Sequence, residues 1–302
     1  MALHEAKNMN TMPSFEKSPA SFSFLNSLQK ESYHRDGYLV LPQFINETIC
    51  RLLIDRANML IANFDASSIK VIFSTQDRRH TKNQYFLESG DKIHFFLEEN
   101  AVNAQGELNT DKLYSINKIG HALHDVDPVF NCFSRMHKIA CLIHDLAIAD
   151  PLLVQSMYIC KQPFMGGEVN CHQDNTFLYV KEQPITGLWF ALEDANRENG
   201  CLWAIPGGHR IPLKSRMLRD KHHQICYETY DHTPWPLEEM VPLEVSRGSA
   251  IVLHGLLPHM SKQNLSSRSR HAYTLHVMSG QHEYAADNWL QRPADMPFRG
   301  FW

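Results

Sequence analysis

Helical spacing of apolar residues dominates the first half of the chain. Residues 46–64 carry their apolar side chains on one side of a helix, and Asn46 in front of them is typical of a helix start. These apolar positions are Ile49, Leu52, Leu53, Ala57, Leu60 and Ile61. We also expect a helix over residues 22–35, helical structure across 115–150, and a turn at 36–37 that leads into a short strand.

The pattern changes after residue 150, where short apolar runs are separated by Gly, Pro, Asn or charged turns. Such runs, rich in Val, Ile, Leu and aromatic residues, predict strands at 152–160, 177–181, 186–193, 202–205, 250–254 and 271–278. Helices followed by strands indicate an α+β protein with a mainly β core, whose strand half could close into a jelly roll or a barrel. Polar residues 1–20 predict a flexible N-terminal arm, which leaves residues 21–302 as a single domain.

Composition and charge narrow the class of protein. The 302 residues are 43% hydrophobic and 21% charged, as in ordinary soluble domains. A net charge of -4 gives no electrostatic reason to expect a nucleic acid or an anionic membrane as partner. No apolar run approaches the ~20 residues of a membrane helix, and the N-terminus lacks the apolar core of a signal peptide. Seven cysteines without a Cys-x-x-Cys pair predict reduced thiols and a cytoplasmic location.

A His-x-Asp step is the first candidate for metal chemistry. The chain has 18 histidines, and His is the commonest metal-binding side chain. In extended chain, His172 and Asp174 project from the same face because strand side chains alternate. A second His from a distant strand would complete the 2-His-1-carboxylate set of non-haem iron. One such step is expected by chance, however, and His34-Arg35-Asp36 is another, at the end of a predicted helix where surface charge is the default.

The third ligand and a carboxylate-binding Arg could come from the end of the chain. A turn at Arg247-Gly248 leads into an apolar strand, and two histidines follow, His254 at the strand end and His259 after a short connection. Arg270 then begins the next strand. From there an Arg can enter a cavity and hold a carboxylate through two parallel hydrogen bonds, although a single Arg is more often at the surface.

Taken in order, these segments resemble the phytanoyl-CoA dioxygenase family. The resemblance rests on His172-x-Asp174, the Glu-Asn-Gly-Cys-Leu stretch 198–202 with the Pro-Gly-Gly-His turn after it, His259-x-Ser261-x-x-Asn264, and Arg270. It covers the chain from about residue 30 to the end, and segments 115–124 and 155–159 match one branch of the family more closely. It implies a double-stranded β-helix (a cupin-like jelly roll) flanked by N-terminal helices.

The resemblance also implies roles for single residues. The implied Fe(II) ligands and catalytic residues are His172, Asp174 and His259, and the implied 2-oxoglutarate contacts are Lys118, Met157, Trp189, Ser261 and Arg270. Its spacing favours His259 over His254 as the third ligand. His209 is expected to have a structural role in the Pro-Gly turn. His121 and His124 are expected on a polar helix face, and the role of His276, on the strand after Arg270, stays open.

The implied activity is that of an Fe(II)- and 2-oxoglutarate-dependent dioxygenase, which uses O2 to hydroxylate a small organic substrate and releases succinate and CO2. Related halogenases lack the carboxylate ligand, so Asp174 favours hydroxylation. The alternatives are a jelly-roll metal-binding protein, or a zinc-type enzyme without 2-oxoglutarate turnover, which would leave Arg270 without its obvious partner. Oligomeric state and substrate stay open, and residues 70–100 or 210–240 are expected to line the outer pocket.

Overall fold

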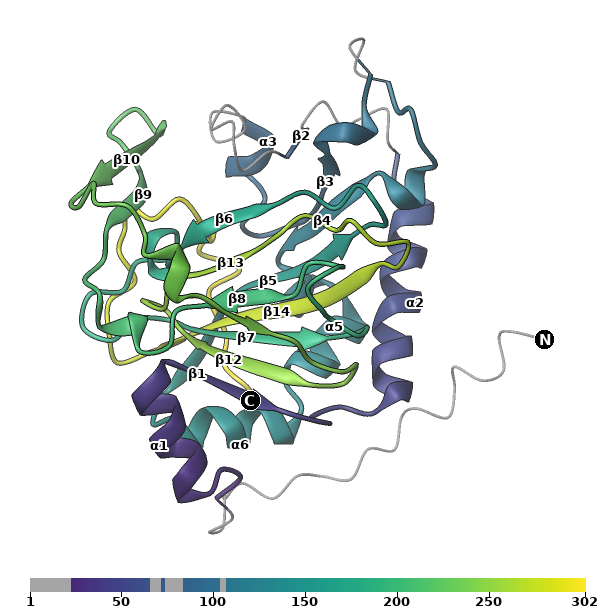
Figure 1. Cartoon of the computed structure of the whole chain (residues 1–302). Coiled ribbons are helices and arrows are strands. Elements are labelled where there is room, and N and C mark those ends of the chain that lie inside the picture. The colour runs from purple at the N-terminus through teal and green to yellow at the C-terminus, as the bar shows by residue number, and fades with distance from the viewer. Residues whose placement is uncertain (1–22, 66–71, 74–83, 104–106) are drawn as a thin grey trace.

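Two β-sheets form the frame of the computed structural model, which describes residues 23–65, 72–73, 84–103 and 107–302 (Figure 1). The larger sheet has the order β1 (Tyr38–Leu41), β12 (Ala250–His254), β7 (Thr186–Ala191), β14 (Arg270–Ser279), β5 (Pro151–Lys161), β4 (Ile116–His121), β3 (Ile93–Glu98) and β2 (Ile72–Phe73). The smaller sheet has the order β11 (Val241–Leu243), β8 (Leu202–Ala204), β13 (His259–Ser261) and β6 (Val169–His172), while β9 (Ser215–Arg219) and β10 (Ile225–Thr229) form a hairpin. The larger sheet therefore combines strands from both halves of the chain, with β1 from the N-terminal part next to β12 from the C-terminal part.

Helices cover the larger sheet on the face turned away from the smaller one. They are α1 (Ser27–Asp36), α2 (Glu47–Asn63), α4 (Leu123–Val126), α5 (Pro128–Ser134) and α6 (His137–Asp145), whereas α3 (Gln84–Leu87) lies near β2 and its Phe86 lines the cavity between the sheets. Leu53 of α2 and Phe133 of α5 share one core cluster with Phe190 of β7 and Tyr273 of β14. The neighbouring Trp189 belongs to a second cluster with strands of the smaller sheet. Successive side chains of one strand thus enter different layers.

Strand β14 shows how this alternation places polar groups inside the protein. All ten of its residues are buried, because both faces of the strand are covered. Tyr273 and Leu275 pack in the helix-side core, and the Tyr273 hydroxyl lies 2.8 Å from Ser134 Oγ of α5. Arg270, Thr274 and His276 have the opposite parity, so they face the space between the sheets.

Several predicted elements are present with shifted ends, and others are wrong. Residues 116–121, expected to be helical, form β4 between β3 and β5; the apolar residues Ile116 and Ile119 are three positions apart, a spacing typical of a helix. Residues 177–181, expected as a strand, form an irregular turn in which the Asn175 side chain bonds the backbone of Val180. The first half of the chain therefore contains β2, β3 and β4 in addition to the one short strand that was expected there and is present as β1.

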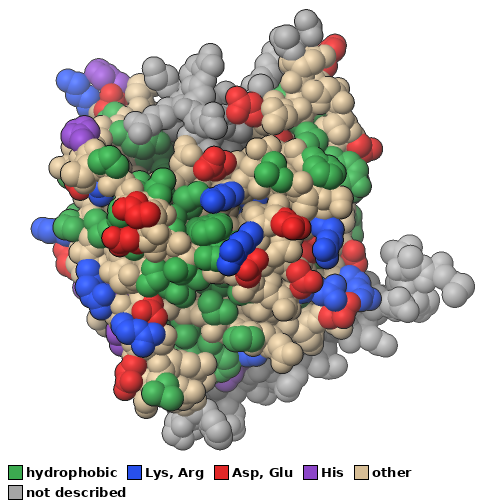
Figure 2. Space-filling model, viewed as in Figure 1, with side chains coloured by type: hydrophobic (Ala, Val, Ile, Leu, Met, Phe, Trp, Pro, Cys, Tyr) green, Lys and Arg blue, Asp and Glu red, His purple; other side chains and the backbone are tan. Residues whose placement is uncertain are grey.

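Two further predictions concern segments and surfaces outside the core. The flexible arm expected over residues 1–20 lies outside the described residues, and the single domain over 21–302 stays a prediction. None of the helices that the structure describes is long and apolar enough to cross a membrane. On the face shown in Figure 2, acidic and basic side chains are interspersed and neither sign dominates, in line with the small net charge.

Candidate metal centre and co-substrate pocket

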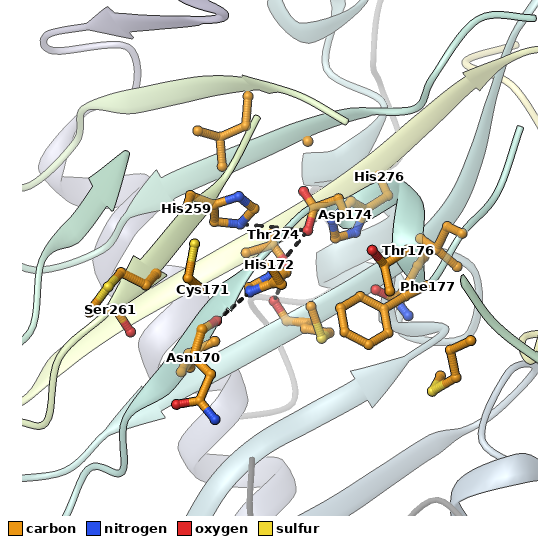
Figure 3. A pocket seen from close by; sticks show the side chains of 18 of the residues that line it. Asn170, Cys171, His172, Asp174, Thr176, Phe177, His259, Ser261, Thr274 and His276 are labelled. Carbon is orange, nitrogen blue, oxygen red and sulfur yellow. Dashed lines mark hydrogen bonds and ion pairs between the residues drawn. The ribbon is translucent and has the colours of Figure 1, made fainter. Parts of the chain in front are cut away.

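Three side chains from different segments converge between the sheets. His172 is the last residue of β6, Asp174 opens a short 3-10 turn at Asp174–Thr176, and His259 begins β13 directly opposite His172. Oδ1 of Asp174 lies 3.5 Å from Nε2 of His172 and 3.6 Å from Nε2 of His259. One potential ligand atom of each residue lies within 4.8 Å of the others. Figure 3 shows the three side chains pointing toward one another.

Hydrogen bonds to carbonyl groups fix how the two imidazoles face this point. Nδ1 of His172 lies 2.8 Å from the Asn170 carbonyl oxygen, and Nδ1 of His259 lies 3.0 Å from that of Leu257. A carbonyl only accepts, so each Nδ1 must donate its hydrogen and each Nε2 must carry a lone pair. Two imidazole lone pairs and a carboxylate oxygen therefore converge with no hydrogen between them. Such a set of electron-pair donors fits a divalent cation.

The protonation states of Asp174 and His259 favour metal binding. Burial disfavours the Asp174 carboxylate, but electrostatic stabilisation by the surrounding imidazoles, His259 and His276 first, holds its pKa well below the usual range. Burial lowers the pKa of His259 to about 4. The carboxylate and the neutral imidazole are the forms that bind metal.

A cavity of about 450 Å³ lies beside these residues, between the two sheets. All eight residues expected at the site line it, namely Lys118, Met157, His172, Asp174, Trp189, His259, Ser261 and Arg270. Register explains part of this assembly: Thr274 of β14 pairs with Trp189 on one side and with Met157 on the other, so these three side chains form one row across the sheet. Arg270 lies two alternations farther along the same face of β14.

Arg270 is a buried cation without a counter-ion among the described residues. It is 1% exposed, its Nε donates to the Gly200 carbonyl at 3.2 Å, and its Nη1 has no hydrogen-bond partner among the described residues. No carboxylate of the described part of the chain lies within 4.0 Å of its guanidinium. A buried charge is costly unless it is paired. The arrangement therefore fits a ligand that brings its own carboxylate to Arg270.

Gly200, whose carbonyl accepts from Arg270, cannot be replaced without strain. Its φ is +83°, and an added Cβ would lie 2.5 Å from Cδ of Lys161 and 2.6 Å from the Lys262 carbonyl oxygen. Only glycine combines this conformation with so close an approach. The Glu-Asn-Gly-Cys-Leu stretch thus positions a backbone acceptor for Arg270.

The other residues expected at the co-substrate pocket surround this guanidinium with apolar surface and a second cation. The Trp189 ring centre lies 5.3 Å from Cζ of Arg270, and Ser261 is buried on β13. Nζ of Lys118 lies 5.4 Å from the Phe96 ring centre, and burial lowers the pKa of Lys118 to about 7. Two cationic side chains with an apolar wall suit a small dicarboxylate.

The remaining histidines lie outside the converging group. His254 accepts a hydrogen bond from the Leu256 amide at its Nδ1, and its ring lies 5.1 Å from that of His209. His121 and His124, expected on a polar helix face, are instead buried at the end of β4 and the start of α4. Their positions differ from the expectation because residues 116–121 form a strand. His34 is exposed, as expected of the second His-x-Asp step.

Two residues near the site were not assigned from the sequence. Nε2 of His276 lies 3.3 Å from Oδ2 of Asp174. The sequence contained one indication of this position: His276 is six residues after Arg270 on the same predicted strand, so both side chains lie on the same face. Gln173, fully buried between His172 and Asp174, donates to the Leu256 carbonyl at 2.9 Å and accepts from the Lys214 amide at 3.1 Å. No sequence pattern indicated these contacts, because they join loops far apart in the chain.

Comparison with known proteins agrees with this geometry. Residues 33–272 match the family described as Phytanoyl-CoA dioxygenase (PhyH). "Phytanoyl-CoA dioxygenase 1" of Oryza sativa subsp. japonica is 47% identical over 272 residues, which are 89% of this chain and 94% of that protein. "Phytanoyl-CoA dioxygenase domain-containing protein 1" of Bos taurus is 42% identical over 284 residues, 91% of this chain and 97% of that protein. The cattle protein represents the branch indicated by segments 115–124 and 155–159.

Solved structures show the same fold at low sequence identity. EctD from S. alaskensis, determined with 2-oxoglutarate and 5-hydroxyectoine, has a TM-score of 0.62 and 17% identity over 92% of this chain and 86% of its own. The α-ketoglutarate dependent carbocyclase SnoK from nogalamycin biosynthesis has a TM-score of 0.60 and 18% identity over 91% of this chain and 97% of its own. The expected double-stranded β-helix, flanked by N-terminal helices, is confirmed.

Proposed function

This chain belongs to the phytanoyl-CoA dioxygenase family, and from that premise we propose that it is an Fe(II)- and 2-oxoglutarate-dependent oxygenase that uses O2 to hydroxylate a small organic substrate. The observation that carries the proposal is the pairing of two features in one cavity. One is the set of three converging electron-pair donors, and the other is the buried guanidinium of Arg270, which lacks a carboxylate partner among the described residues. A bound cation would complete the set of donors, and an anionic co-substrate would pair with the guanidinium.

His172, Asp174 and His259 would hold the iron. Three ligands on one face leave open positions on a non-haem iron, as the 2-His-1-carboxylate set does in oxygenases. Iron held by these residues would, with 2-oxoglutarate and O2, supply the oxidising power for hydroxylation, with succinate and CO2 formed from the co-substrate. The carbonyl groups of Asn170 and Leu257 keep both imidazoles turned so that Nε2 faces the cation.

The chain's own contribution to co-substrate binding is positioning and exclusion of water. Arg270 would pair with the far carboxylate of 2-oxoglutarate, with the Ser261 hydroxyl as a further donor and Lys118 as a second cation. Trp189 and Met157 form the apolar wall that keeps water from these charges. In such a desolvated site each charge-assisted hydrogen bond is stronger than it would be in water.

The outer part of the cavity supports a small, largely apolar substrate. Its lining includes Phe177 beside the triad and Met217, Tyr227 and Trp235 from the expected 210–240 region. Nζ of Lys214, at the same wall, already binds its own neighbours, the Thr233 carbonyl and hydroxyl at 2.5 and 2.7 Å and Asp231 Oδ2 at 3.0 Å. From the other expected region, Phe86 lines the cavity, while residues 74–83 lie outside the described residues.

Anaerobic purification followed by addition of Fe(II), 2-oxoglutarate and O2 tests the proposal through succinate release. We expect slow succinate formation even without the substrate to be hydroxylated, and none when Zn(II) replaces Fe(II). Absence of both 2-oxoglutarate binding and succinate release would overturn the oxygenase assignment. Zn(II)-supported turnover of another kind would favour the zinc-type alternative. Once a substrate is found, 18O2 should label a new hydroxyl group, and an unlabelled rearranged product would overturn the hydroxylase assignment alone.

A further inference from the structure

A third histidine approaches the same carboxylate from the side opposite the triad. His276 of β14 is buried, and its Nε2 lies 3.3 Å from Oδ2 of Asp174, whereas His172 and His259 both approach Oδ1. Figure 3 places His276 behind Asp174, away from the point where the other two rings meet. The two oxygens of Asp174 therefore have different neighbours.

The hydrogen on His276 can be assigned from its surroundings. Its Nδ1 is buried without a hydrogen-bond partner among the described residues, and its Nε2 faces a carboxylate oxygen. A hydrogen on Nδ1 would be left without an acceptor, while a hydrogen on Nε2 meets one. His276 is thus a donor to Asp174. This role is the reverse of that of His172 and His259, whose Nε2 atoms carry lone pairs.

Backbone packing narrows the space around the same oxygen. Gly187 of β7 pairs with His276, and a Cβ built on Gly187 would lie 3.0 Å from Oδ2 of Asp174 and 3.7 Å from Cδ2 of His276. Glycine leaves a notch that the carboxylate fills. Oδ2 is therefore confined between the backbone of Gly187 and the ring of His276.

Resting on the proposed function, we propose that His276 is a positioning residue for the metal carboxylate, because it holds Oδ2 of Asp174 and so keeps Oδ1 turned toward the two histidine ligands. A carboxylate free to rotate could offer both oxygens to the cation and occupy a position that the co-substrate needs. With Oδ2 held by His276 and confined by Gly187, only one oxygen is presented. Groups of this kind, which act through a ligand, typically change metal affinity by about 10- to 100-fold when removed.

The test measures metal binding directly, by competition with a chromogenic chelator. Mn(II) serves as the probe in air and Fe(II) under anaerobic conditions, each added to full-length protein freed of metal. His276→Ala should weaken binding by about 10- to 100-fold, and His276→Gln should restore most of it because its amide N–H reaches the position of Nε2. His276→Asn places its amide near Nδ1 and should not rescue. His271→Ala is the matched control: a buried histidine of the same strand that contacts the Tyr158 hydroxyl at 2.8 Å, away from the cavity.

The outcomes separate this inference from the proposed function. If wild-type protein binds metal and folded His276→Ala binds it within about threefold, the positioning role is wrong and the proposed function stands. Should His276→Ala fail to fold, the Asn and Gln variants carry the test, and equal affinities for these two would overturn the role. Weakening in His271→Ala as large as in His276→Ala would also overturn it, since the effect would then be one of packing. Failure of the wild type to bind either metal would overturn both inferences.

Discussion

Two buried carboxylates in this protein have opposite surroundings. Oδ1 of Asp125 lies 2.7 Å from Nη2 of Arg135 and 2.9 Å from Nη2 of Arg299, while Oδ2 lies 3.1 Å from Nη2 of Arg292. Burial opposes ionisation of Asp125, but its interaction with His124, followed by hydrogen bonds from Arg299 and Arg135, holds its pKa far below the usual range. Asp174, in contrast, is surrounded by imidazoles and by no arginine within 4.0 Å in the described part of the chain.

The two clusters differ in whether the partners of the carboxylate still have an unused lone pair. An arginine is always protonated, so the three arginines give both oxygens of Asp125 a counter-charge, although Nε and Nη1 of Arg292 have no hydrogen-bond partner among the described residues. Two of the histidines around Asp174 donate elsewhere and aim lone pairs inward, so this cluster is complete only with a cation. Arg270 shows the complementary case, a buried cation that is complete only with an anion. Burial of a charge therefore does not mark a functional site by itself; a missing counter-ion does.

The largest expected effect is loss of the metal. His172→Ala removes one of three ligands, and we expect the protein to lose its iron, with affinity weakened by more than the ~100-fold typical of residues behind the ligands. Metal analysis after gel filtration measures this. His254→Ala, a histidine that faces His209 instead of the triad, serves as control and should retain iron. Equal iron content in both variants would contradict the assignment of the metal site.

Breaking the closed cluster should instead reduce stability. Asp125→Ala leaves three arginines without their carboxylate, and removal of one partner from a buried ion pair typically costs about 3–5 kcal/mol. Urea unfolding should show this loss, while the iron content of the folded protein stays unchanged. Asp36→Ala is the control, because its partner Arg35 has a side chain that is 71% exposed and such surface pairs contribute roughly 0–1 kcal/mol. A loss of iron without a loss of stability in Asp125→Ala would contradict the claim that the Asp125 cluster stabilises the fold and does not take part in metal binding.

The sequence predicted much of the site because its residues come in ordered, spaced motifs. His172-x-Asp174 alone was indistinguishable from His34-x-Asp36, and a later His259 and Arg270 at strand boundaries separated them. Strand β14 was predictable for the same reason, since its apolar run is long and bounded by turns. The role of Arg270 as an unpaired cation, however, depends on which carboxylates are absent around it, and the sequence does not contain that information.

Other features depend on contacts between distant segments. The notch that confines Asp174 requires the register between β7 and β14, which sets Gly187 beside His276. The Asp125 cluster joins residues that are up to 174 positions apart, so no local spacing indicates it. Residues 116–121 were misassigned because Ile116 and Ile119 are spaced as on a helix and the segment lacks the alternation that identifies a strand. Local pattern thus predicted elements and motifs, and tertiary pairing decided the partners.

Removing the charge of Arg270 should lower the affinity for 2-oxoglutarate without lowering the stability of the fold. Arg270→Met should weaken 2-oxoglutarate binding by at least about 2 kcal/mol, roughly 30-fold, since the ligand carboxylate loses its buried partner. The ligand-free protein should keep its stability or gain some, because an uncompensated buried charge is removed. Arg292→Met is the matched control and should destabilise, since Arg292 contacts Asp125. Calorimetric titration of Mn(II)-loaded protein and urea unfolding give the two readouts, and unchanged 2-oxoglutarate affinity would contradict the role of Arg270.

The smallest expected effect is a pH dependence that originates from the other cation of the pocket. Burial lowers the pKa of Lys118 from 10.5 to about 7, so the side chain loses its proton as pH rises through 7. A dicarboxylate favours the protonated form, and 2-oxoglutarate affinity should therefore fall above pH 7, by at most about tenfold per pH unit for one linked proton. In the ligand-free protein the sign is opposite: between pH 7 and 10.5 the unfolded chain binds more protons at Lys118, so its contribution to stability rises with pH. Titrations on either side of pH 7 test both, and Lys118→Met should remove both slopes. If the affinity of Lys118→Met for 2-oxoglutarate still falls with pH, the linked proton belongs to another group. Arg270 would then be the cation of this pair that binds the ligand.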